Sequence, residues 1–280
     1  MNWRAGAVAL VAVAATACGN GSSGSSAGHS NEDVLSVIKA AASTTADQQT
    51  QRFRGTLTMD LGAVTGQSTG KVTAEVAGAM QTKPLAGRMT MSGMQVAGQD
   101  VGTITALITP DAMYMKMPAL ADRLGKPWFE IKFSDIKAAS GLDMSQLTSQ
   151  AQQMQPAQYI QQLAESGDVH VVGTETVNGI ETTHYSGTVS LKEALSHYTA
   201  QMRRQLEPIM NSAGFTGSDI DVWLDDKGLV RRVRSSAEGG KGTFALSMDI
   251  LAYGVPVDVT PPPADQVADL GQIAATGSTG

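Results

Sequence analysis

The sequence predicts an α+β protein built on a single large curved antiparallel sheet, an unclosed half-barrel of about ten or eleven strands with helices on its concave side. Two observations predict this class. Apolar and polar residues alternate over many short segments, which are separated by Gly, Pro, Asn or Asp turns and not by helices. Three longer segments have helical spacing of apolar residues, and each must bury its apolar stripe against the concave face.

Composition narrows the class of protein. The chain has 280 residues, 42% of them hydrophobic, which is enough for a sizeable core. Its formal net charge of −6 argues against nucleic acid as a partner, because a phosphate backbone attracts a basic surface. The single cysteine excludes an intrachain disulfide, a Cys-based zinc site and a CxxC redox motif.

The N-terminus has the layout of a secretory signal. Arg4 precedes an apolar run over residues 5–15, and this run is shorter than the roughly 20 residues that a membrane-spanning helix needs. Small residues then lead to Cys18, and this ending resembles the lipobox of bacterial lipoproteins. We therefore expect a signal peptide over residues 1–17, lipidation of Cys18 and anchoring on the extracellular face of the cell membrane.

The rest of the chain divides into three parts. Residues 18–31 comprise Cys18 and a Gly- and Ser-rich stretch, which predicts a flexible tether. The folded domain is expected over residues 32–263, where three consecutive prolines end it. Residues 264–280 are expected to be a disordered C-terminal tail.

The elements of the domain are predicted in chain order. Asn31 before an acidic turn predicts an N-capped helix that runs to about Thr45. Helical segments are also predicted over 142–165, divided at Pro156, and over 191–211, which Pro208 ends or kinks. The predicted strands are 53–61, 72–80, 85–93, 101–109, 112–117, 127–133, 168–177, 180–190, 219–225, 229–237 and 243–253.

Three segments carry a resemblance to a known family: Lys126 to Ile131, Val172 to Val189 and Asp221 to Val233. The second is the most specific, because it places Asn178-Gly179, typical of a type I′ hairpin, before Thr-His-Tyr and Gly-Thr-Val. The chain resembles the LppX/LprA/LprF/LprG-type lipoproteins of actinobacteria, whose fold is related to that of the LolA and LolB carriers. The resemblance implies an unclosed barrel, helices on one side, and a hydrophobic cavity for acylated lipids or glycolipids, with no catalytic motif and no cofactor.

Methionine is the residue type that best suits such a cavity. Seven methionines lie between residues 80 and 117, and flexible, polarizable Met side chains adapt to irregular apolar partners. Ordinary core packing is the alternative role. The candidate cavity residues, taken from apolar faces of the predicted strands and of the 191–211 helix, are Leu57, Met59, Val72, Val76, Met113, Met115, Met117, Leu195 and Met202.

The remaining polar residues form no catalytic or metal-binding motif. The histidines at 170, 184 and 197 lack metal-ligand spacing, and the aspartates between 219 and 226 lack the offsets of a calcium loop. The basic clusters Arg203-Arg204 and Arg231 to Arg234 have two interpretations, a solvated surface or a contact for anionic head groups.

These observations favour a non-enzymatic, monomeric envelope lipoprotein that binds an acylated lipid or glycolipid, with transport of that lipid left open. The alternative is an accessory or scaffold lipoprotein with a filled core that binds another envelope protein. A hydrolase is a third reading, for which the sequence supplies no acid–base motif. An open apolar cavity would favour the first reading over the second.

Overall fold

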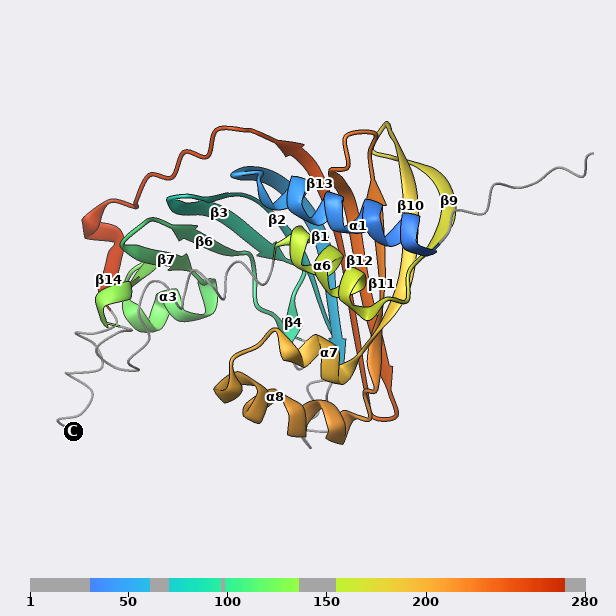
Figure 1. The fold of residues 1–280 in the computed structure, drawn as a ribbon. Coiled ribbons are helices and arrows are strands. Elements are labelled where there is room, and N and C mark those ends of the chain that lie inside the picture. The colour runs from blue at the N-terminus through green and yellow to red at the C-terminus, as the bar shows by residue number, and fades with distance from the viewer. Residues whose placement is uncertain (1–30, 61–70, 97–98, 136–154, 270–280) are drawn as a thin grey trace, which may run out of the picture. The chain divides into compact units, whose positions relative to one another are not determined.

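A twelve-stranded sheet organises the described part of the chain, residues 31–60, 71–96, 99–135 and 155–269 of a computed structural model (Figure 1). In chain order its strands are β1 (Thr50–Asp60), β2 (Lys71–Thr82), β3 (Leu85–Ser92), β6 (Ile104–Ile108), β7 (Ala112–Lys116), β8 (Trp128–Lys132), β9 (His170–Val177), β10 (Ile180–Ser190), β11 (Gly217–Leu224), β12 (Val230–Gly239), β13 (Gly242–Tyr253) and β14 (Val267–Asp269). Two short strands, β4 (Gln95–Val96) and β5 (Gln99–Asp100), pair separately.

Five α-helices and one 3-10 turn accompany the strands in the described residues. They are α1 (Asn31–Ala46), α3 (Pro118–Leu124), α6 (Pro156–Ser166), α7 (Leu191–Ser196), α8 (Ala200–Ala213) and η1 (Ala264–Gln266). The signal peptide, Cys18, the tether as far as Ser30, and the part of the predicted 142–165 helix before residue 155 lie outside the described residues.

The sheet consists of two meanders that meet at its centre. Its order is β14-β8-β7-β6-β3-β2-β1-β13-β12-β11-β10-β9. From β1 the chain runs outward to β8 at one side, begins again at β9 on the other edge, and returns through β10, β11 and β12 to β13. The antiparallel pair β1–β13 joins the two meanders. Strands β14 and β9 are the two ends of this linear order, so the sheet is unclosed.

The predicted fold class is confirmed, with one addition. All eleven predicted strands are present in the main sheet, and Asn178 and Gly179 have the positive φ angles, 50° and 82°, that the predicted hairpin requires. The twelfth strand, β14, belongs to the region expected to be a disordered tail. It pairs in parallel with β8, so regular structure continues past residue 263 as far as Asp269.

The predicted helix over 191–211 is two helices in the structure. Ser190 caps α7 and Thr199 caps α8, so the chain turns between them. Pro208 lies inside α8 and does not end it, because the helix continues to Ala213. The break changes the helical phase, and Ile209 of α8 is 41% exposed. A short helix over 118–124, α3, was not predicted.

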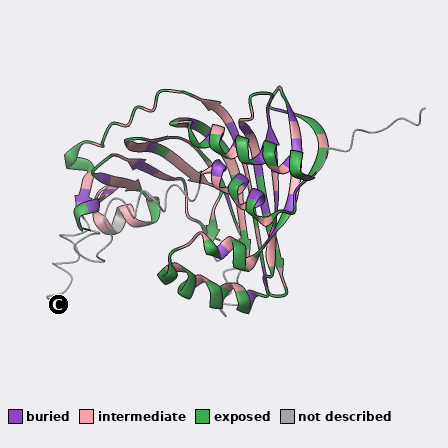
Figure 2. Cartoon of the chain, in the orientation of Figure 1, coloured by how far each residue is buried: buried purple, intermediate pink, exposed green. Residues whose placement is uncertain are grey.

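The main core lies between one half of the sheet and helices α1 and α6, where many residues are buried (Figure 2). Ile38 of α1 and Ile160 and Leu163 of α6 are fully buried, and they join Val222 and Ile250 of the sheet in one cluster. α6 packs on β10, β11 and β12, and α1 packs on α6. We call the side of the sheet that α1 and α6 cover the inner face.

Candidate functional site

The strand register shows which side chains share the inner face. Residues directly opposite each other on neighbouring strands point to the same side of a sheet, as do residues two apart along one strand. Phe53 of β1 belongs to the main core, so Leu57 and Met59 share its face. Met59 lies opposite Val72 of β2 and Phe244 of β13, which extends the same apolar row across three strands.

An apolar cavity of about 230 Å³ lies between this face and helices α6, α7 and α8. The sheet supplies its floor through β1, β11, β12 and β13, and the helices supply its walls. Its lining residues are mainly aliphatic, aromatic or Met: Met59, Tyr159, Gln162, Leu191, Ala194, Leu195, Tyr198, Leu206, Met210, Phe215, Gly217, Ser218, Ser235, Ala237 and Phe244.

Local capping interactions position the helices over the cavity. The Ser190 hydroxyl accepts a hydrogen bond from the backbone N–H of Glu193, and the Glu193 carboxylate accepts one from the backbone N–H of Ser190 at 2.9 Å. Hydrogen bonds from the Ser190 hydroxyl and backbone lower the pKa of Glu193. At the start of α8, the Thr199 hydroxyl accepts from the N–H of Met202 at 3.2 Å.

Helix α8 packs loosely in comparison with α6. Ala213, at its last turn, is its only buried residue, whereas α6 buries five (Figure 2). Among the described elements, α8 makes its main contact with α7. Because few buried apolar contacts hold this helix, its movement away from the sheet would expose little core.

A few polar atoms interrupt the apolar lining. Ser235 of β12 is 6% exposed, and no hydrogen bond joins its hydroxyl to another residue of the described ranges. Tyr159 of α6 also lines the cavity; burial, with a smaller contribution from Tyr198, raises its pKa to about 12. Both hydroxyls are therefore neutral groups that could hydrogen-bond to a ligand oxygen.

The structure separates the predicted cavity residues into two groups. Met59 and Leu195 line the cavity. Leu57 lies two residues before Met59 on β1, Val72 lies opposite Met59 on β2, and both are half-buried. Val76 packs against the main core, and Met202 is half-buried on α8.

The three candidate methionines of residues 113–117 lie away from this cavity. Met113 and Met115 are on β7, opposite Ile131 and Phe129 of β8, and are half-buried. Met117 follows the strand with extended backbone and is the N-cap residue of α3. None of the three lines the 230 Å³ cavity.

The lining residues that were not predicted come from the helices, from strands β11–β13 and from two loop positions. Phe215 follows the C-cap of α8, and Tyr159 lies on α6, beyond Pro156. Leu206 and Met210 sit four residues apart, one helical turn, and this spacing could have been recognised once Thr199 was taken as a new helix start. Ser235 and Ala237 alternate with charged or polar residues on β12, a weaker signal.

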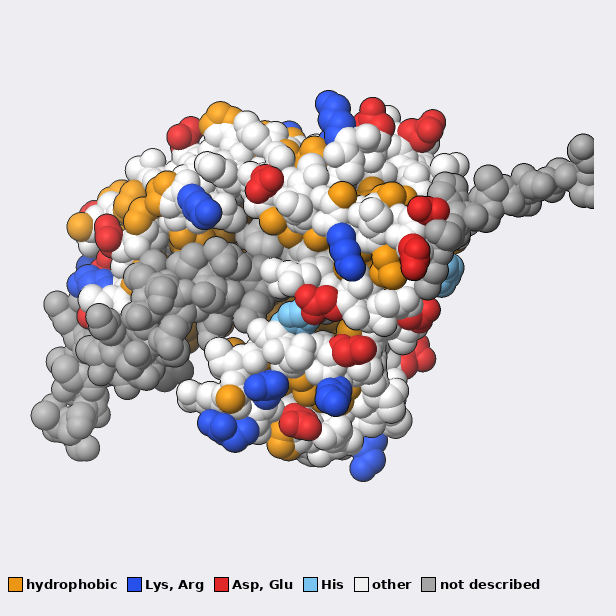
Figure 3. Space-filling model, in the orientation of Figure 1, with side chains coloured by type: hydrophobic (Ala, Val, Ile, Leu, Met, Phe, Trp, Pro, Cys, Tyr) orange, Lys and Arg blue, Asp and Glu red, His pale blue; other side chains and the backbone are white. Residues whose placement is uncertain are grey.

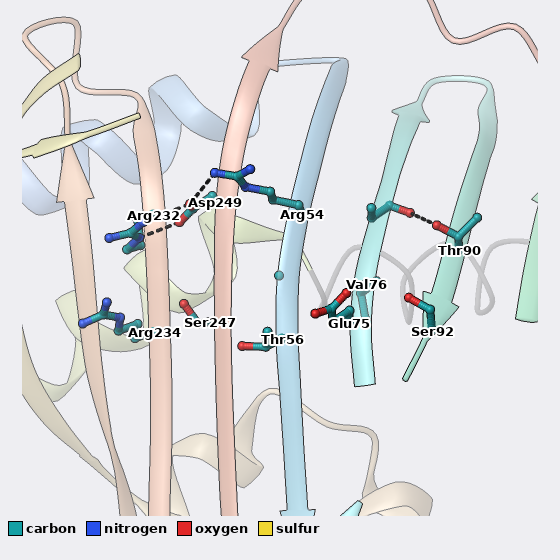
Figure 4. A pocket seen from close by; sticks show the side chains of 12 residues that line it. Arg54, Thr56, Glu75, Val76, Thr90, Ser92, Arg232, Arg234, Ser247 and Asp249 are labelled. Carbon is teal, nitrogen blue, oxygen red and sulfur yellow. Dashed lines mark hydrogen bonds and ion pairs between the residues drawn. The ribbon is translucent and has the colours of Figure 1, made fainter. Parts of the chain in front are cut away.

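A polar depression of about 410 Å³ lies on the opposite, outer face of the sheet (Figure 4). There Arg232 donates two hydrogen bonds to Asp249, one of them at 2.9 Å from Nη2, and Arg54 lies 3.9 Å from the same carboxylate. Burial alone would raise the pKa of Asp249, but the hydrogen bonds from Arg232 and Asn178 outweigh it and lower that pKa. These charges partner one another, so the depression is the weaker candidate site.

The buried His184 side chain on the outer face is held by contacts with neighbouring residues. The His184 ring stacks on Trp223 with centroids 4.1 Å apart, and its Nε2 lies 2.8 Å from Asp221. Glu175 approaches the other ring nitrogen at 3.2 Å. Within the ranges that the structure describes, no group of three or more His, Cys, Asp or Glu residues could hold a metal ion.

The unclosed sheet with helices on its inner face resembles the fold of solved structures. LprF from Mycobacterium bovis matches with a TM-score of 0.50 and 15% identity, over 85% of this chain and all of LprF. LppX from Mycobacterium tuberculosis matches over 82% of this chain and all of LppX, with a TM-score of 0.49 and 15% identity. The LprF likeness supports the fold alone.

The sequence comparison then defines the family. The LppX_LprAFG lipoprotein family matches residues 36–259, and the chain belongs to this family, as the sequence resemblance predicted. A Streptomyces griseus protein described only as a 31.2 kDa protein is 30% identical over 156 residues, 55% of this chain. The chain spans about half the length, 51%, of the curated relatives it matches. In the described residues, no helix has the length and apolar character needed to span a bilayer.

Proposed function

We propose that this protein is a membrane-anchored lipoprotein of the cell envelope that binds an acylated lipid or glycolipid in the cavity beneath α6, α7 and α8. The observation that carries the proposal is the apolar cavity itself, bounded by Met59, Leu195 and Phe244 on a fold shared with LprF. Membership of a lipoprotein family supports the envelope location.

The physical basis of binding is burial of an acyl chain. Each methylene removed from water contributes about 0.8 kcal/mol, so sheltering even part of a chain is worth several kcal/mol. The cavity volume of about 230 Å³ is below the roughly 300 Å³ at which sites for drug-sized ligands begin. It therefore suits a segment of one acyl chain, and the loosely packed α8 could admit more by moving outward.

Anchoring would place the cavity close to a source of lipid. We propose that Cys18 is acylated after removal of residues 1–17 and that the tether to residue 31 links it to the folded domain. A protein held at the membrane and able to shelter an acyl chain could also carry it across a short aqueous gap. Loss of palmitate-analogue labelling and of membrane fractionation in Cys18→Ser would support this anchor, and unchanged labelling would refute it.

The cavity can be tested by filling it. Ala237 lies opposite Phe244, and both line the cavity, so Ala237→Phe would place a ring inside it. We expect the non-acylated full chain (Cys18→Ser) to bind a pyrene-labelled fatty acid, and Ala237→Phe to weaken that binding at least tenfold while its thermal unfolding stays cooperative. Fluorescence titration measures the affinity.

The matched control is Ala245→Phe, on the outer face of the neighbouring strand β13, where the alanine is exposed. It adds the same ring without entering the cavity, so binding should be unchanged. If neither the parent protein nor either variant binds any acyl probe, and organic extraction yields no lipid, the scaffold alternative replaces lipid binding.

A further inference from the structure

Helix α8 separates two surfaces of opposite character. Leu206 and Met210, one turn apart, line the apolar cavity. Arg203, Arg204 and Glu207, on another side of the same helix, line a groove on the outside of α7 and α8. A single helix therefore has an apolar wall and a charged wall within one turn of each other.

The groove has a volume of about 640 Å³ and is basic. Its charged residues are Lys192 of α7 and Arg203, Arg204 and Glu207 of α8, three cations and one carboxylate, in a chain whose formal net charge is −6. Lys and Arg side chains gather over these helices in Figure 3. No ion pair joins Arg203 or Arg204 to any other described residue.

The cavity and the groove share part of their walls. Leu191 and Leu195 of α7 and Phe215, which follows α8, line both. At this shared wall, a ligand bound in the cavity would have its polar end beside the groove that Arg203 and Arg204 line, and neither guanidinium group has an ion-pair partner among the described residues. Guanidinium groups bind carboxylate and phosphate oxygens through paired N–H donors.

We infer that the protein selects an anionic amphiphile: its acyl chain occupies the cavity, and its carboxylate or phosphate lies against Arg203 and Arg204 at the rim between α7 and α8. This inference rests on the proposed function and adds the charge of the head group to it. The apolar lining sets affinity through burial, and the two arginines set the preference for a negative head group.

A pair of probes that differ by one charge tests the inference. Pyrenedodecanoic acid and its methyl ester share the same chain, and the non-acylated full chain (Cys18→Ser) can be titrated with each at pH 7.5. We expect the acid to bind about threefold to tenfold more tightly than the ester, as exposed charge pairs contribute modestly. Raising the salt concentration should reduce this ratio without weakening ester binding.

Arg203→Gln/Arg204→Gln is the test variant. It should bring the acid-to-ester ratio close to one and leave ester affinity unchanged. Arg52→Gln/Arg88→Gln removes the same charge from exposed arginines of the outer face, where both lie beside Ala79, and should keep the parent ratio. This control separates a local contact from the effect of net charge.

The outcomes distinguish this inference from the proposed function. If neither probe binds, the cavity proposal fails. If both bind equally and the test variant behaves as the parent, lipid binding stands and the anionic site is refuted. If the variant changes only the binding of the protein to vesicles containing phosphatidylglycerol, the arginines contact a membrane surface and not the head group of the bound ligand, which also overturns the inference.

Discussion

The two halves of the inner face are filled in different ways. Under α1 and α6, the strands β10–β13 contribute fully buried aliphatic residues such as Ile220, Val222 and Val233. On β3 and β7, the same face carries Met89, Met91, Met113 and Met115, all half-buried. Aliphatic side chains with few rotamers specify one packed arrangement, whereas Met adapts its three flexible bonds to irregular neighbours.

This difference indicates which part of the inner face stabilises the fold and which part has adaptable packing. The aliphatic half joins two helices to the sheet in one continuous core, so it should account for most of the folding free energy. The apolar cavity lies towards the other end of strands β11–β13, under α7 and α8, where packing is looser. Stable packing and an open interior therefore sit on the same strands, a few residues apart.

The largest loss of stability should come from a substitution in the aliphatic core under α1 and α6. Ile160 of α6 is 0% exposed and contacts the main core, so Ile160→Ala removes buried methyl groups and leaves a cavity. We expect a loss of about 3 kcal/mol in the free energy of unfolding, measured by urea denaturation. A loss below 1 kcal/mol would mean that α6 is not part of the stabilising core.

A smaller loss of stability should come from a substitution on the outer face of β13. Asp249→Asn removes the charge that pairs with Arg232, and we expect a loss of about 2 kcal/mol at pH 7. Because the folded-state pKa of Asp249 is lowered, its contribution is present above the unfolded pKa of about 3.9 and is lost as pH falls through the folded value.

The pH dependence checks the cause of that loss. The difference in unfolding free energy between parent and Asp249→Asn should shrink between about pH 5 and pH 2, because the parent carboxylate becomes protonated there. Asp219, exposed on the same face of β11, serves as control: Asp219→Asn should change stability by less than about 0.5 kcal/mol. A pH-independent difference would show that Asp249 acts through packing and not through charge.

The smallest loss of stability should come from a substitution among the methionines of β3 and β7. Met113 is half-buried on β7, so Met113→Ala should cost about 1 kcal/mol or less by the same urea measurement. Met113→Leu should be close to neutral, since the two side chains have similar volumes. A loss as large as that of Ile160→Ala would mean that both halves are equally well packed, and the contrast between them would disappear.

Local patterns predicted most of the elements. Alternation of apolar and polar residues identified all eleven long and medium strands of the main sheet, and Asn178-Gly179 identified its tightest hairpin. The two clearest misses have different causes, one local and one tertiary. Thr199 restarts the helix after α7, and the chain beyond Pro263 forms β14 because an edge strand, β8, is available to pair with it.

The candidate site was less predictable than the fold. Met59 and Leu195 were identified from apolar periodicity, but Phe215, Tyr159 and Ser235 were not. Periodicity tells which face of one element is apolar, and it gives no information on which faces meet. The methionine count pointed to β7, whereas the methionines that line the cavity are Met59 of β1 and Met210 of α8.

The sequence by itself determined the family, the strand segments and the apolar faces, because each depends on residues close together in the chain. Only the tertiary structure decided that β1 pairs with β13, that β14 joins β8, and that α8 stands between an apolar cavity and a basic groove. These features depend on contacts between residues far apart in sequence, and which distant faces meet is set by the packing of the whole domain, which no local pattern encodes.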